Sequence, residues 1–138
     1  MINPKQMFYS VSLGILMASL LFSSYNIKAQ EENEEEAEND PLTILSTIRT
    51  LLNQSITELN AGNYTGASEL VDIAYIDNYE YIEGPLEELD SDLMEETEVM
   101  IREDLASAIE DKKPLGEITT LHNNIRSNLD KAEQLFKQ

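Results

Sequence analysis

The sequence predicts an all-α protein, an antiparallel up-down four-helix bundle that follows an N-terminal signal or anchor segment. Apolar residues recur every three or four positions in four successive stretches between residues 41 and 138, which is the spacing of amphipathic helices. The connections between these stretches are short and rich in Gly, Pro, Asp and Asn, and short connections favour antiparallel neighbours. No stretch shows the alternating apolar and polar pattern of a half-buried strand.

Residues 1–29 have the pattern of an export signal. Lys5 gives a positive start, residues 7–24 are uncharged and almost wholly apolar or small, and Ala29 closes an acceptable cleavage site. Because an apolar run of about 18 residues is also near the lower limit for crossing a bilayer, a retained membrane anchor is the alternative. In both cases the positive-inside rule predicts an extracytoplasmic domain, secreted or tethered to the outer face of the cytoplasmic membrane.

The charge of the chain limits its partners. Residues 30–40 are dominated by glutamate and are predicted to form an acidic, disordered spacer. The whole chain has 27 acidic residues and a net charge of −18, which opposes binding to nucleic acid or to an anionic lipid surface and favours cations or basic partners. There is no cysteine and only one histidine, His122, which excludes thiolate sites and a multi-histidine metal site within one chain.

The four-helix bundle domain is predicted over residues 41–138. Its first helix begins with Asp40 as the N-cap and Pro41 at the first helical position, a strong start signal. Gly62 suits the left-handed position that ends this helix. The second helix starts near Thr65 and continues to residue 89.

Proline shapes the remaining helices. At Gly84-Pro85 the missing backbone donor predicts a kink or a short break within the second helix. The third helix is predicted over residues 91–111, and the fourth opens at Pro114 and continues to residue 136 at close to heptad spacing.

Three acids of the second helix, Asp77, Glu80 and Glu83, are the candidate metal ligands. They lie three residues apart, so their like charges repel on neighbouring turns unless a cation intervenes. Oxygen ligands suit a divalent or ferric cation, although one helix face needs further ligands to enclose it. The alternative is a solvated face, because an ideal helix places Glu80 and Glu83 almost opposite the apolar stripe.

The same face predicts a docking surface. With 100° per residue, Ile76 and Tyr79 fall among the acids rather than on the core side. Apolar side chains set among carboxylates are typical of contact surfaces. The predicted partner-binding residues are Ile76, Tyr79, Glu80, Glu83 and Glu87.

Other polar residues complete the prediction. Asn78 and Asp104 fall within apolar stripes, so both are predicted to be buried. The predicted hydrogen bonds are between Asn78 and Asp104, or between Asp104 and a tyrosine hydroxyl, and the alternative is that they line a ligand pocket. Asn63 and Asn53 match the N-glycosylation pattern. No catalytic constellation appears in the sequence, so we do not expect an enzyme.

Several motifs carry a family resemblance. The chain resembles the extracytoplasmic helical domain that precedes the membrane part of some iron permeases, over roughly residues 55 to 135. The permeases' membrane part has no counterpart in this sequence, so the resemblance implies a stand-alone domain that offers carboxylates to a cation or docks on a membrane complex. The motifs are Ala61-Gly62-Asn63-Tyr64, Ala74-Tyr75-x-Asp77-x-Tyr79-Glu80-x-x-Glu83-x-x-Leu86, Asp90-x-x-Leu93-x-x-Glu96, Arg102 and Glu103-Asp104-Leu105.

These observations predict a non-enzymatic, extracytoplasmic helical-bundle module that docks on a membrane protein complex, or on another basic partner surface, through an acidic face. The alternative is a carboxylate-based protein that binds or delivers a metal such as iron, copper or calcium.

Overall fold

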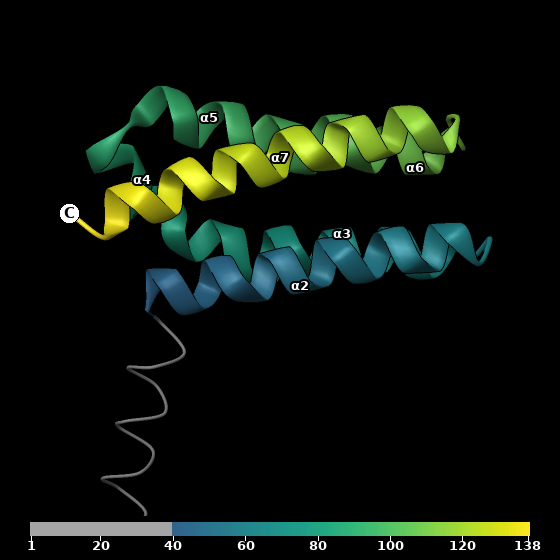
Figure 1. Ribbon diagram of the computed structural model, residues 1–138, viewed down its shortest axis with the longest axis horizontal. Coiled ribbons are helices and arrows are strands. Elements are labelled where there is room, and N and C mark those ends of the chain that lie inside the picture. Colours follow the sequence, from purple (N-terminus) through teal and green to yellow (C-terminus); the bar gives the residue numbers. More distant parts are fainter. Residues whose placement is uncertain (1–39) are drawn as a thin grey trace, which may run out of the picture. The chain divides into compact units, whose positions relative to one another are not determined.

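The computed structural model describes residues 40–138, and every regular element in that part is helical (Figure 1). The predicted all-α class and its four helices are therefore confirmed for this part of the chain. The signal or anchor segment, 1–29, and the acidic spacer up to residue 39 lie outside the described residues. The elements are α2 (Pro41–Asn60), α3 (Tyr64–Ala74), η2 (Tyr75–Tyr79), α4 (Glu80–Leu89), α5 (Ser91–Val99), η3 (Met100–Leu105), α6 (Ala106–Glu110) and α7 (Leu115–Phe136).

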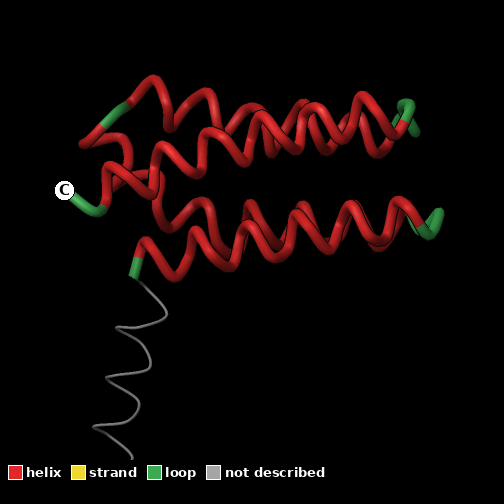
Figure 2. Tube along the Cα trace, in the orientation of Figure 1, coloured by secondary structure: helices red, strands yellow, loops and turns green. Residues whose placement is uncertain are grey.

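Continuity of the chain groups these elements into four helices. The first helix is α2, the second joins α3, η2 and α4, the third joins α5, η3 and α6, and the fourth is α7. The first helix contacts the second and the fourth, and the third helix also contacts both, so the four surround one core. Figure 2 shows the short connections at the ends of the helices, where the chain reverses direction.

Helix starts follow from side chains that accept backbone N–H groups. Asp40 accepts from the Thr43 N–H, Asn63 from the Gly66 N–H and Asp90 from the Leu93 N–H, so each caps the helix that follows. Two turn residues have positive φ, Gly62 at 79° and Lys112 at 52°. Both end a helix in the left-handed conformation, which glycine adopts without the steric cost that Lys112 carries.

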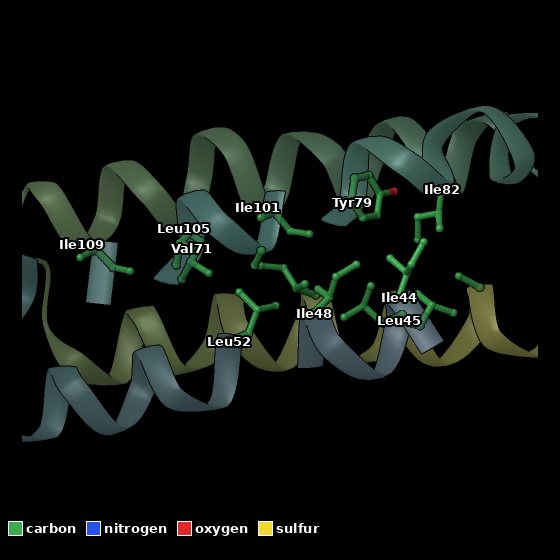
Figure 3. Close-up of a cluster of buried hydrophobic side chains, with 14 of the residues drawn as sticks. Ile44, Leu45, Ile48, Leu52, Val71, Tyr79, Ile82, Ile101, Leu105 and Ile109 are labelled. Atoms are coloured by element: carbon green, nitrogen blue, oxygen red, sulfur yellow. The ribbon is translucent and has the colours of Figure 1, made fainter. Parts of the chain in front are cut away.

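The core is formed by aliphatic side chains from all four helices. Ile48 of α2, Ile82 of α4, Ile101 of η3 and Ile125 of α7 are fully buried. Figure 3 shows Tyr79 and Ile82 in the same cluster as Ile44 and Ile48. Burial of such side chains supplies most of the folding free energy in a chain without disulfides.

The short break predicted at Gly84-Pro85 is not formed, because α4 continues through Pro85 in its interior. Glycine before proline reduces the steric clash that usually disfavours helical geometry at that position. Because proline has no N–H, Pro85 cannot donate to the carbonyl of Tyr81, four residues earlier. The predicted kink at this proline stays a prediction, and the π-helical segment η2 lies upstream of it.

Within residues 40–138, no helix combines the length and the apolar character that crossing a bilayer requires.

Candidate functional site

The second and third helices each contain a π-helical segment, η2 and η3. A π-helical turn includes more residues than an α-helical turn, so the side chains beyond it are rotated relative to an ideal α-helix. Such segments are frequent at functional sites. In this chain η2 coincides with the most distinctive run of tyrosines and carboxylates, which therefore forms the candidate site.

Tyr79 lies in the core, so its predicted outward position in a docking surface is wrong. Its exposed fraction is 0%, and its hydroxyl donates to the backbone carbonyl of Met94 at 2.9 Å. The extra residue in η2 rotates Tyr79 away from the acidic face and toward the third helix. Burial raises the pKa of the Tyr79 hydroxyl, so this group is protonated at neutral pH.

Tyr75 is half-buried and joins the second helix to the third. Its ring stacks on that of Tyr79 with centroids 6.4 Å apart, and its hydroxyl donates to a carboxylate oxygen of Glu98 at 3.3 Å. Burial and the charges of Glu83 and Glu98 raise the pKa of Tyr75 to about 12. Arg102 completes the group, 3.2 Å from Glu98 and with its guanidinium 5.9 Å from the Tyr75 ring centroid.

Glu83 also turns inward, toward this cluster. Its side chain is half-buried, and its Oε1 is buried without a hydrogen-bond partner among the described residues. Burial, followed by the nearby charge of Glu98, raises the pKa of Glu83. The cluster of Tyr75, Glu83, Glu98 and Arg102 is thus a polar contact between the second and third helices.

The predicted metal ligands, Asp77, Glu80 and Glu83, do not form a group of three arranged to hold a metal ion. Asp77 and Glu80 are exposed, whereas Glu83 is half-buried and faces Glu98. No group of three or more His, Asp or Glu side chains in residues 40–138 is arranged to hold a metal ion. An ion at Asp77 and Glu80 would therefore need ligands from water or from a second protein.

The exposed side of the second helix combines apolar and acidic side chains. Ile73, Asp77 and Tyr81 are spaced by four residues, as are Asp72, Ile76 and Glu80, and all six are exposed. Because residues four apart share one side of a helix, the six form two adjacent stripes. We name them the outer surface. Of the five predicted partner-binding residues, Ile76 and Glu80 lie on it and Glu87 is exposed further along, while Tyr79 and Glu83 turn inward.

The predicted burial of Asn78 and Asp104 is wrong. Asp104 is exposed, and Asn78 is half-buried, with its amide donating to the backbone carbonyl of Ile73 at 3.0 Å. Asn78 belongs to η2 and Asp104 belongs to η3. Both π-helical segments shift their side chains away from the positions that an ideal α-helix would give them. The predicted pairing of Asn78 with Asp104 is therefore not formed.

The buried polar residues are Ser55, Thr97, His122 and Asn128 in the described part. The hydroxyl of Ser55 donates to the carbonyl of Ala67 at 2.9 Å, across the contact between α2 and α3. Thr97 donates to Leu93 of its own helix. The sequence signal for Ser55 is its spacing, because it lies three residues after Leu52 and seven after Ile48, on the apolar stripe of α2.

The two predicted glycosylation residues lie at the surface. Asn63 is exposed between the first two helices, where its amide donates to Glu58 and its oxygen accepts from Gly66. Asn53 is exposed within α2, but Ser55 of the same motif is buried. Modification of either residue stays a prediction.

Comparison of the chain with models of protein families, with curated protein sequences and with solved structures finds no match. The resemblance to the helical domain of iron permeases therefore stays a prediction from the motifs.

Proposed function

We propose that this chain is a non-enzymatic, extracytoplasmic helical-bundle module that docks on a membrane protein complex with a basic contact surface. In this proposal the four helices form an antiparallel up-down bundle behind an N-terminal signal or anchor. The observation that carries the proposal is the outer surface, where Ile73, Ile76 and Tyr81 are 40%, 53% and 64% exposed among carboxylates.

The chemistry of the outer surface supports a protein partner. Exposed apolar side chains gain free energy when a partner removes them from water, at roughly 25 cal/mol per Å² of apolar area. Asp72, Asp77 and Glu80 alternate with them along the helix, and none takes part in an ion pair within residues 40–138. A partner with lysine or arginine around an apolar pocket matches both features.

Site-specific photo-crosslinking tests the proposal. A photoreactive amino acid at Ile76 of the full chain is expected to give one discrete crosslinked product in intact membranes of cells that make the protein. The same group at Gln54, exposed on α2, is the matched control and is expected to give none. Asp77→Lys with Glu80→Lys should abolish the Ile76 product because both charges then repel a basic partner.

Two results would count against the proposal. One is recovery of only the free monomer with the group at Ile76. The other is a crosslinked product that forms equally from Gln54 or persists after both charge reversals.

A further inference from the structure

A groove runs between the third and fourth helices. It consists of two hollows of about 570 Å³ and 580 Å³. The first is lined by residues of η3, α6 and α7, and the second by residues of α5, η3 and α7. Both hollows are lined by Asp104 and Leu121, so they adjoin and form one groove.

The groove has an apolar floor and an acidic rim. Val99, Met100 and Leu121 are half-buried and line it from both helices. Seven carboxylates line the two hollows against a single basic residue, Lys113. Among residues 40–138, Glu103 is the only one of these seven carboxylates that forms an ion pair, with Arg102.

We propose that this groove binds a basic amphipathic helix of a partner protein. A helix with apolar side chains at positions i, i+3 or i+4 and i+7 places them along one line, which suits an apolar floor between acidic rims. Lysine and arginine beside that line would lie against the rim carboxylates. On the third helix the lining extends from residue 92 to residue 111, roughly 28 Å at 1.5 Å per residue, or about five helical turns.

Charge selects this occupant over segments of the same chain. The acidic stretch of residues 30–40 carries the same sign as the rim, and a second copy carries a net charge of −18. Because like charges repel across an interface, neither residues 30–40 nor a second copy of the chain is favoured as the occupant of the groove. The proposal is independent of the proposed function, because the groove lies on the third and fourth helices and the outer surface lies on the second.

Peptide binding to the full-length chain tests the inference. The probe is a fluorescent 18-residue peptide with leucines at i, i+3, i+4 and i+7 spacing and lysines elsewhere, measured by anisotropy at about 0.15 M NaCl, where the Debye length is about 8 Å. A scrambled peptide of the same composition, with leucines spread around the helix, is the control. The patterned peptide is expected to bind at least about tenfold more tightly, equivalent to about 1.4 kcal/mol.

Two charge-matched variants locate the binding surface. Glu95→Lys with Asp104→Lys and Glu117→Lys reverses three exposed charges of the rim. Asp72→Lys with Asp77→Lys and Glu80→Lys reverses three on the outer surface. We expect the rim variant to weaken binding at least about tenfold and the outer variant by less than about threefold, since short-range pairs matter more than net charge at this salt.

Circular dichroism verifies that both variants keep their helical content. Leu121→Ala retains every charge and removes apolar contact area from the floor of the groove. This variant is therefore expected to bind the patterned peptide more weakly than the parent. The inference is overturned if both charge variants weaken binding equally, if the scrambled peptide binds as well as the patterned one, or if Leu121→Ala has no effect.

Discussion

The hydroxyl of Tyr79 ties the second helix to the third from within the core, because it donates to the carbonyl of Met94. We expect Tyr79→Phe to lower the free energy of unfolding by about 1 kcal/mol, the usual net value of such a hydrogen bond. Urea denaturation measures this change. Tyr81→Phe, on a residue that the structure leaves exposed, is the matched control and is expected to change stability by less than about 0.5 kcal/mol. Equal effects of the two substitutions would contradict the assigned role of Tyr79.

Glu83 makes stability depend on pH with a definite sign. Its pKa in the folded chain is raised above the ordinary 4.5, so the folded state holds this proton more tightly than the unfolded state. The resulting stability is present below about pH 4.5 and is lost as the pH rises through the folded pKa. We therefore expect Glu83→Gln to be more stable than the parent at pH 7, by about 0.2–1 kcal/mol for a partly solvated charge.

Urea titrations from pH 4 to pH 8 measure this difference, which should shrink as the pH falls. Glu87→Gln removes one negative charge from an exposed position on the same helix and serves as the control. If both variants differ from the parent in stability by the same amount at each pH, the inward position of Glu83 is not the cause of the pH dependence.

At the scale of the helices, the sequence predicted the first and fourth helices well because both keep α-helical periodicity throughout. Asp40, Pro41 and Gly62 marked the ends of α2 through capping and backbone preferences that act locally. The side chains of the second and third helices were predicted less well. The π-helical segments η2 and η3 change the phase of the helical periodicity, and no residue preference in the sequence predicts this change. Tyr79 and Asp104 were therefore predicted on the wrong sides of their helices.

The same change of phase explains which parts of the candidate site were predicted. Ile76 and Glu80 lie on the outer surface as expected, because their outward positions tolerate a rotation of part of a turn. Glu83 lies after η2, so the change of phase turns its side chain from the predicted outward position toward Glu98. Contacts between helices, such as that of Tyr75 with Glu98, depend on packing that one helix alone does not specify.

The turn after α2 gives a prediction at the same scale. Gly62 has φ of 79°, and a Cβ at this position would meet no atom within 4 Å, so any cost of a side chain is backbone strain. We expect Gly62→Ala to lower the melting temperature by an amount equivalent to about 1–2 kcal/mol. Gly116→Ala, in α7 and equally free of contacts, is expected to be neutral or to stabilise by up to about 1 kcal/mol. Destabilisation of similar size in both variants would argue against the left-handed turn.

For the whole molecule, the dominant electrostatic term is self-repulsion. The chain carries a net charge of −18, and an excess of one sign destabilises the compact state. Raising NaCl from about 0.1 M to 1 M shortens the Debye length from about 10 Å to about 3 Å. We expect the melting temperature to rise by about 4–8 °C, equivalent to about 1 kcal/mol for a domain of this size. Differential scanning calorimetry measures the change, and a falling melting temperature would show that attractive ion pairs dominate instead.

A comparison of calcium with magnesium distinguishes general charge screening from a specific carboxylate metal site. Because no group of three or more carboxylate or histidine side chains in residues 40–138 is arranged to hold a metal ion, 1 mM CaCl₂ and 1 mM MgCl₂ in 0.1 M NaCl are expected to shift the melting temperature equally. A site that encloses Ca²⁺ with six to eight oxygens would discriminate between the two ions. A Kd of about 10 μM would add about 2.7 kcal/mol at 1 mM calcium. Such a calcium-selective shift, abolished by Glu80→Gln with Glu83→Gln, would favour the metal-binding alternative over docking.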